Sequence, residues 1–469
     1  MKEFDVLIVG AGVVGASLAV HLGRQGYQVQ VIDRCQNTTK TLSGELLQPG
    51  GVQALEKLGL MDSLKDIDAQ PVHGFVVFDQ AQARCLDYPQ NKQLQGREQK
   101  KNKPIQGFSF HHHRFVDGLR KHLHTQESIS FVTGQVKKLL FEGERVIGVS
   151  YKNAKKELCT SKAKLTVLAC GRNAQWTRTQ GEDKSRSGPQ RHRISYSVGL
   201  YLKGATLPHP HYGHVLLTKP APSLMYQLDQ DTIRVLIDIP GELPPARNGA
   251  LQSFLKKEIL PQLPEQVKPA FLEALEESSP QSIQIFQCAP THKHPPGMVR
   301  VGDALGMRHP LTGGGMTVAL NDAYQLSKQI RTVDWERSKQ RDKAVRRFYR
   351  SRETMALTID LLAGALYDIF KAESPGSAMM RDAVMDYWSR GGIAVSGPME
   401  LLAGLQPNPA KLLGHYLAVS CLGFIRQLGT RSSGKFVPIQ ECKAGATLLQ
   451  ESLRTLYNQA KCRLKLFSS

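Results

Sequence analysis

The sequence predicts an α/β fold, α+β overall, in which a unit of parallel strands and helices is divided by an inserted, mostly antiparallel sheet. A helical region follows at the C-terminus. Three observations predict this arrangement: a glycine-rich turn between a strand and a helix at the N-terminus, a similar turn after a strand near residue 300, and long apolar helical segments in the last third of the chain. We therefore divide the chain into residues 1–190, 191–290, 291–345 and 346–469.

Length, charge and cysteine content limit the class of protein. At 469 residues the chain exceeds the size of a single core, and 41% of its residues are hydrophobic. The formal net charge of +20 suggests an anionic partner, either nucleic acid or a membrane surface. Nucleic acid is not expected, because the chain has no zinc-finger spacing and no aromatic-flanked basic motif. The 8 cysteines include no CxxC pair and are expected to be free thiols.

The N-terminal segment has the pattern of a dinucleotide site. The apolar run Phe4–Val9 predicts a buried parallel strand, which the chain enters at once, so we expect no signal peptide before it. Gly10 permits a tight turn, Gly12 lets the backbone approach a pyrophosphate, and Gly15 lets the following helix pack on the strand. A second strand ends at Asp33, where a carboxylate can accept hydrogen bonds from a ribose. Together they predict a Rossmann-type unit, whose turn consists of Gly10, Ala11, Gly12, Val13, Val14 and Gly15.

A second segment favours FAD over NAD as the dinucleotide. A strand ends at Gly302 and Asp303, and the Asp303 carboxylate can accept hydrogen bonds from ribityl hydroxyls. The backbone amides at the next helix start can bond the pyrimidine edge of a flavin and stabilise negative charge there. That helix start consists of Gly313, Gly314, Gly315 and Met316. The alternative is an Asp-capped turn before an ordinary core helix.

Several longer segments make the chain resemble the squalene monooxygenase (squalene epoxidase) family, within the flavin hydroxylases of the para-hydroxybenzoate hydroxylase type. The most specific of them are GELLQPGG at 44–51, IDAQ at 67–70, FHHHRF at 110–115, MRHPLTGGGMT at 307–317, and the proline-containing positions 397–398 and 407–409. The resemblance implies that Asp33 and Arg34 contact the adenosine end of FAD. It also implies that Leu46 and Val136 lie at the cofactor and that Arg114 approaches it from a helix. A solvated surface arginine is the alternative for Arg114.

The resemblance also points to the reacting centre and to departures from the family pattern. Glu45 and Gln48 are the nearest candidates for a catalytic role, beside the isoalloxazine. Family members place a tyrosine where this chain has Phe75, and its hydroxyl orients the glutamine that matches Gln48. They also carry an acid where this chain has Cys170. Phe75 is expected in the substrate pocket, but it cannot supply the hydroxyl.

The adjacent histidines 111–113 are not expected to bind a metal. Successive positions on a helix project about 100° apart, so three neighbours do not converge on one ion. No metal site is predicted elsewhere.

Strands are expected at Ser195–Leu202, Ser223–Leu228 and Thr232–Ile237, in a sheet that forms one wall of the substrate cavity. Tyr226 is a candidate lining residue of that cavity, and simple core packing is the alternative.

The C-terminal region predicts monotopic membrane association. Thr354–Phe370 and Leu401–Ile425 are strongly apolar, with a break at 407–409, and the nearly uncharged stretch Leu412–Ile425 is too short to span a bilayer. The basic residues that follow are Arg426, Arg431, Lys435, Lys443, Arg454, Lys461, Arg463 and Lys465. We expect the cytoplasmic face of the endoplasmic reticulum in a eukaryote, or of the inner membrane in a bacterium. A helical cap over a soluble core is the alternative.

The expected function, implied by the resemblance, is epoxidation of squalene to (S)-2,3-oxidosqualene through a flavin hydroperoxide. NADPH is the expected electron source, and because only one dinucleotide fingerprint is evident, the electrons are expected to pass through a separate flavoprotein reductase. Phe75 and Cys170 favour a second hypothesis, a related flavoprotein that acts on another polyprenoid lipid. A third hypothesis is a flavin-binding protein without enzymatic activity.

Overall fold

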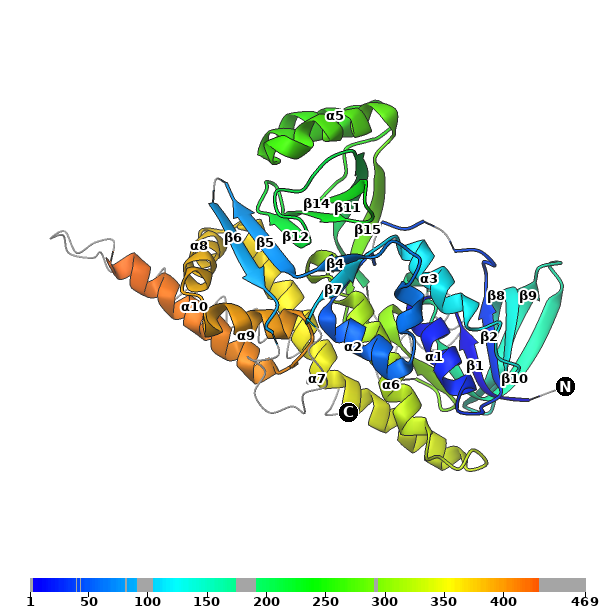
Figure 1. Ribbon diagram of the computed structural model, residues 1–469. Helices are drawn as coiled ribbons and strands as arrows, with labels where there is room; N and C mark the ends of the chain where they lie inside the picture. Colours follow the sequence, from blue (N-terminus) through cyan, green and yellow to red (C-terminus); the bar gives the residue numbers. More distant parts are fainter. Residues whose placement is uncertain are drawn as a thin grey trace.

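The fold is described by a computed structural model, which covers residues 3–38, 40–42, 44–80, 82–90, 104–173, 191–290 and 294–429. Two large sheets lie side by side with helices around them, and the last helices extend to one side (Figure 1). This arrangement confirms the predicted α/β class. The basic residues expected between 431 and 465 lie outside the described part of the chain.

The first large sheet holds the N-terminal glycine-rich turn. Five strands pair in parallel in the order β8–β2–β1–β10–β16, and β9 pairs antiparallel with both β8 and β10. Because β16 lies beside β10, the segment near residue 300 joins the same sheet as the N-terminus. The strands are β1 (Phe4–Val9), β2 (Val29–Asp33), β8 (Ile129–Glu142), β9 (Arg145–Asn153), β10 (Leu158–Leu168) and β16 (Met298–Arg300).

Helices from both halves of this unit pack on one another and share its core. α1 contacts α3 and α6, and α6 also contacts α2. Burial of apolar side chains from β1, α1, α3 and α6 in one cluster stabilises the unit. The helices are α1 (Val13–Gly23), α2 (Pro49–Leu58), α3 (His112–Lys121) and α6 (Gly315–Ile330).

The second large sheet has seven strands in the order β15–β11–β14–β13–β12–β5–β6, and only β12 and β5 pair in parallel. This confirms a mostly antiparallel sheet, with one correction. Strands β5 and β6 come from the predicted first region, so the sheet is not confined to 191–290. The strands are β5 (Gly74–Asp79), β6 (Gln82–Asp87), β11 (Arg191–Lys203), β12 (Tyr212–Leu216), β13 (Ser223–Gln227), β14 (Thr232–Pro240) and β15 (Gln281–Cys288). Helices α4 (Ala250–Phe254) and α5 (Lys268–Glu277) belong to the core on one of its faces.

The C-terminal helices begin earlier than the sequence suggested. α7 is continuous over Ser338–Lys371, so the expected boundary between 345 and 346 falls inside a helix that packs on α6 at one end and on α8, α9 and α10 further along. The others are α8 (Pro375–Ser389), α9 (Ile393–Leu402) and α10 (Pro409–Gly429). Within the described ranges, none of the helices combines the length and the apolar character that a bilayer crossing requires.

A small three-stranded sheet connects the two large ones. β3 (Leu46–Leu47) pairs with β7 (Gly107–Ser109), which pairs with β4 (Gln70–Val72). It places residues 45–48 directly before α2, next to the turn that precedes α6.

Candidate functional site

The glycines of the N-terminal turn meet three different constraints. Gly10 has φ +104°, and a Cβ there would lie 2.6 Å from the Ala169 carbonyl oxygen. A Cβ on Gly15 would lie 1.9 Å from the Gly10 carbonyl oxygen, so only glycine lets α1 pack this closely. A Cβ on Gly12 would meet no atom within 4 Å. Gly12 therefore borders open space at the N-terminus of α1, as a phosphate cradle requires.

Asp33 is tied to this turn. Its Oδ2 accepts a 2.7 Å hydrogen bond from the Ala11 N–H, and its Oδ1 accepts a 2.9 Å bond from the Cys35 N–H. Each carboxylate oxygen keeps further acceptor capacity for a ribose hydroxyl. Arg120 of α3 is buried beneath the turn, where Nε donates to the Ala11 carbonyl at 2.8 Å and Nη2 pairs with Asp33 at 3.3 Å. Arg120 thus holds the turn and its acid together, and sequence reasoning missed it.

The other residues expected to contact the cofactor differ in their surroundings. Arg34 and Arg114 are exposed, on the loop after β2 and in the first turn of α3. Val136 is buried in β8, in an apolar cluster with Val9 and Ile32. Contact of these three residues with FAD stays a prediction.

The second glycine-rich segment lies against the first. Gly302 has φ +57°, and a Cβ there would lie 3.3 Å from Cγ1 of Val14 in α1. Its N–H donates to Oδ2 of buried Asp322 at 2.9 Å, and Asp322 pairs at 2.7 Å with buried Arg352 of α7. Asp303 follows with its side chain exposed. The two segments are far apart in the sequence but lie side by side, as an extended dinucleotide would need.

The turn that precedes α6 forms the second helix N-terminus of the site. Gly313 has φ +60°, and a Cβ there would lie 2.9 Å from Cδ2 of Leu46. A Cβ on Gly314 would lie 2.5 Å from Cγ2 of Ile359, whereas a Cβ on Gly315 would meet nothing within 4 Å. Met316 is buried just inside the helix. The first amides of α6 have no side-chain cap and border open space.

These residues fit FAD. Gly12 and Gly315 stand at the N-termini of two long helices and border open space, while Gly10, Gly15 and Gly313 are packed against protein. The amides around Gly12 would hold the pyrophosphate and Asp33 the ribose. Asp303 would hold the ribityl chain, and the amides at Gly313–Met316 would hold the flavin.

Glu45 is fully engaged in a buried ion pair. Its two oxygens accept 2.8 Å hydrogen bonds from Nε and Nη2 of Arg234 in β14, and Tyr226 donates to Oε2 at 3.2 Å. The Arg234 guanidinium also lies 3.7 Å from the ring centroid of Tyr201. Burial alone would lower the pKa of Arg234, but the bonds and charge of Glu45 outweigh it and raise the pKa. Burial also raises the pKa of Tyr226, so its hydroxyl stays protonated.

Gln48 connects the turn that precedes α6, called the flavin-side turn below, to the second sheet. Its Nε2 donates a 2.6 Å hydrogen bond to the Thr312 carbonyl, and its Oε1 accepts a 2.5 Å bond from the Tyr88 hydroxyl. Gln48 is completely buried, and burial raises the pKa of Tyr88, which therefore remains a donor. The amide orientation is fixed by a donor on one side and an acceptor on the other.

An apolar cluster lies beyond Gln48. Phe75 is buried in β5, and its ring meets the Tyr88 ring edge to face at 6.3 Å between centroids. Leu46, Leu311 and side chains of α7, α8 and α9 complete the cluster. The site thus has a polar, backbone-rich side and an apolar side, separated by Gln48.

Comparison with known proteins identifies the family. The squalene epoxidase family model matches residues 162–437, and the FAD dependent oxidoreductase model matches residues 5–88. Over 430 residues the sequence is 39% identical to squalene epoxidase 3 of Arabidopsis thaliana, with 91% of this chain and 79% of that protein covered. It is 34% identical to squalene epoxidase erg1 of Schizosaccharomyces pombe over 469 residues, 96% of this chain and 97% of that protein. The chain belongs to the squalene epoxidase family. It is an FAD-dependent monooxygenase.

Solved structures agree at the level of the fold. p-Nitrophenol 4-monooxygenase PnpA from Pseudomonas putida superposes with a TM-score of 0.69 at 17% identity, over 87% of this chain and 100% of that chain. The flavin-dependent brominase Bmp2 gives a TM-score of 0.63 at 16% identity, over 92% of this chain and 100% of that chain.

Within the squalene epoxidase family pattern, the two departures have different consequences. The hydroxyl missing at Phe75 is replaced by that of Tyr88, which reaches Gln48 from the end of β6. Cys170 is half-buried directly behind the first glycine turn, since a Cβ on Gly10 would lie 3.0 Å from its Cα.

The adjacent histidines at positions 111–113 do not converge on one point, and two of them contact different partners. His111 Nε2 lies 2.8 Å from Asp229 Oδ2, and His112 Nδ1 lies 2.8 Å from the Gly44 carbonyl. Burial lowers the pKa of His112, which favours the neutral ring as donor to that carbonyl. His112 thereby ties α3 to the segment that leads to Glu45.

Sequence reasoning missed Arg120, Arg234, Tyr88 and Asp322. The first three act on partners 109, 189 and 40 residues away, and no local motif marks them. A buried carboxylate at Glu45 does imply a cationic partner, so the existence of a residue like Arg234 was open to inference, although not its position.

Proposed function

We propose that this chain is a squalene monooxygenase, which converts squalene to (S)-2,3-oxidosqualene in sterol or triterpenoid biosynthesis. The observation that carries the proposal is the position of Gln48, which bridges the flavin-side turn at Thr312 and the apolar cluster at Tyr88 and Phe75. An alkene held in that cluster would face the flavin. The names of the relatives, squalene epoxidases from a plant and a yeast, support squalene as the substrate.

When bound, FAD supplies the chemistry, because a reduced flavin and dioxygen can deliver an electrophilic oxygen atom to an alkene. The chain's own residues hold the reactants and exclude water. Glu45 does not serve as a base, since Arg234 binds both of its oxygens. Gln48 carries no titratable proton, and its bonds to Thr312 and Tyr88 keep its amide in one orientation. The role of both residues is therefore to position the cofactor and the alkene.

Electrons from NADPH are proposed to arrive through a separate flavoprotein reductase. The support is an exposed basic stripe on α7, whose members recur at helical spacing and pair with no carboxylate in the described part of the chain. The stripe consists of Lys339, Lys343, Arg346, Arg347 and Arg350. It would attract an acidic partner surface. Reversing the charge at Lys343 and Arg347 should slow reductase-driven turnover and leave reduction by dithionite unchanged. Equal slowing of both rates would contradict this docking site.

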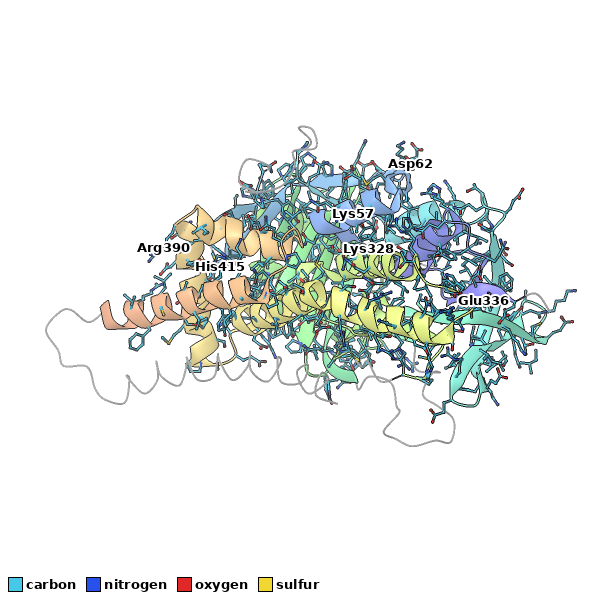
Figure 2. The ribbon with its side chains drawn as sticks, turned by 90° about the horizontal axis from the view of Figure 1, so that it is seen from below. Lys57, Asp62, Lys328, Glu336, Arg390 and His415 are labelled. Atoms are coloured by element: carbon cyan, nitrogen blue, oxygen red, sulfur yellow. The ribbon has the colours of Figure 1, made fainter. Side chains whose placement is uncertain are left out.

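The membrane surface is proposed to contact α10. Its exposed side chains Leu413, Leu417, Phe424 and Ile425 recur at helical spacing along one stripe. His415 points the other way, because its Nδ1 lies 2.7 Å from the Tyr387 hydroxyl of α8. Figure 2 shows His415 and Arg390 near one end of the molecule and Glu336, just before α7, near the other. The stripe therefore lies on the side of α10 that faces away from α8.

Vesicle binding tests this surface. Replacing Leu417 and Phe424 with serine should reduce cosedimentation with anionic vesicles severalfold, because buried apolar area drives interfacial binding. Leu158 is also exposed, at 69%, but lies in β10 and serves as the control. Leu158→Ser should bind as the wild type does. Equal loss in both variants would contradict a docking face on α10.

Product identity tests the substrate. Purified protein with FAD, NADPH, a flavoprotein reductase and equal amounts of squalene and a geranylgeranyl lipid should yield oxidosqualene as the main product by mass spectrometry. Exclusive oxidation of the other lipid would establish the alternative, a flavoprotein for another polyprenoid, which Cys170 still favours. Phe75 no longer does, because Tyr88 restores the hydroxyl bond to Gln48.

A further inference from the structure

A second set of buried hydrogen bonds holds the flavin-side turn, through residues other than Gln48. His309 directly precedes the 3₁₀ turn Pro310–Thr312, and its Nδ1 accepts the Leu311 N–H at 3.2 Å. Its Nε2 lies 3.3 Å from Oδ1 of Asp238 in β14. Since Nδ1 accepts a hydrogen bond, the ring proton sits on Nε2 and points at Asp238. The ring thus links the second sheet to the turn.

Asp238 is a buried carboxylate that three donors satisfy. Besides His309, the Tyr367 hydroxyl donates to Oδ2 at 2.6 Å and the Ser195 hydroxyl donates to Oδ1 at 2.5 Å. In the described part of the chain no lysine or arginine pairs with it. Burial, reinforced by the charge of Asp238, raises the pKa of Tyr367, which keeps its hydroxyl a donor. Without these donors the buried charge would be costly, so the donors and the carboxylate fix one another.

Tyr367 also touches His309 directly. The two rings stack at 3.9 Å between centroids with an interplanar angle of 24°. Tyr367 belongs to α7, Ser195 to β11 and Asp238 to β14, so one cluster joins the second sheet, the C-terminal helices and the turn. Gln48 separately binds the next residue of the turn, through the Thr312 carbonyl.

We propose that Asp238, Tyr367 and Ser195 are positioning residues, which act through His309 to fix the turn that holds the flavin. The turn is anchored at Leu311 by one cluster and at Thr312 by Gln48. With both anchors in place, Gly313–Met316 present the first amides of α6 in one arrangement. This inference deepens the proposed function and rests on it only for FAD binding, not for the identity of the lipid.

The test compares two tyrosines of α7 that are both buried and hydrogen-bonded. Tyr367→Phe removes a donor to Asp238, whereas Tyr349→Phe removes a hydroxyl that accepts the Arg300 N–H at 3.0 Å. We expect Tyr367→Phe to raise the FAD dissociation constant about tenfold and to shift the visible spectrum of bound flavin. Both variants should lower the melting temperature of the apo-protein by a similar amount. Tyr349→Phe should nevertheless keep the FAD affinity and the flavin spectrum of the wild type. Equal FAD affinity and an identical spectrum in the two variants would overturn the proposal.

A double substitution separates positioning from general destabilisation. His309→Phe keeps an aromatic ring beside Tyr367 but loses the bonds to Asp238 and Leu311. The double variant combines His309→Phe with Tyr367→Phe. If Tyr367 acts through His309, this double variant should bind FAD no more weakly than His309→Phe alone. If the two substitutions instead reduce FAD affinity additively, Tyr367 does not act through His309, and the proposal is contradicted. If the wild-type protein fails to bind FAD, the proposed cofactor site is wrong. If it binds FAD but makes no oxidosqualene, only the assignment of squalene as the substrate is wrong.

Discussion

The two sides of the site are built in different ways. On the FAD side, glycines within two short segments present backbone amides at two helix N-termini, and Gly10 and Gly15 are constrained by main-chain atoms of Ala169 and Gly10. On the side of the second sheet, the groups that matter are side chains from distant segments, such as Arg234 on Glu45 and Tyr88 on Gln48. The first kind of site is visible as a motif. The second kind exists only after the chain has folded.

The buried ion pair on the second-sheet side should show the largest effect. Arg234→Met leaves Glu45 buried without its cation, which should lower the free energy of unfolding by about 3–5 kcal/mol in urea titrations. Arg426→Met breaks an exposed pair with Asp386, whose partners are 50% and 53% exposed, and should cost less than about 1 kcal/mol. Adding Glu45→Gln to Arg234→Met should restore part of the loss. If the Arg234 and Arg426 variants lose similar amounts of unfolding free energy, the buried pair does not stabilise the fold more than an exposed pair.

A histidine of the second sheet makes stability depend on pH. Burial lowers the pKa of His214 to about 4 from 6.5, and its neutral ring accepts the His209 N–H at 3.2 Å. Below pH 6.5 the unfolded chain binds the proton more readily than the folded one, so stability is highest above 6.5 and falls as pH drops toward 4. The loss from this group should approach about 3 kcal/mol. The stability advantage of wild type over His214→Gln should narrow over that window in denaturant titrations, and a constant difference would contradict the assignment.

On the FAD side, two neighbouring glycines should fail in different ways. Gly12→Ala places a methyl in open space, where it would block the cofactor, so the apo-protein should keep its melting temperature and lose FAD affinity about tenfold to a hundredfold. Gly15→Ala places a methyl 1.9 Å from the Gly10 carbonyl oxygen and should destabilise the apo-protein itself. Calorimetry and flavin titration of both variants check this contrast. Unchanged FAD affinity in folded Gly12→Ala protein would remove the turn from the site.

The smallest effect is expected at the link between the two sides. Tyr88→Phe removes the bond to Gln48 Oε1 and should lower kcat about tenfold, with little change in FAD affinity. Tyr226→Phe loses a longer bond, 3.2 Å to Glu45, and serves as the comparison. Steady-state kinetics with squalene measure both. A normal kcat in Tyr88→Phe would show that Gln48 needs no second anchor.

The sequence predicted the fold class, both glycine-rich segments and the strands between 195 and 237, because each depends on local pattern. It did not predict that β5 and β6 would join the second sheet, since that depends on the pairing of β5 with β12 across the chain. It also left Gln48 without a hydroxyl partner, because comparison at Phe75 alone does not reveal that Tyr88 lies within reach. Asp238 and Tyr367, 129 residues apart, show the same limit.

A single turnover under oxygen-18 gas tests the proposed epoxidation of squalene most directly. Protein loaded with FAD is reduced chemically without oxygen, mixed with squalene in detergent, and then exposed to the labelled gas. We expect 2,3-oxidosqualene that carries one labelled oxygen, in an amount close to that of the reduced FAD, with a slower rate in Tyr88→Phe. Reoxidation of bound FAD in the wild type without labelled oxidosqualene would contradict it.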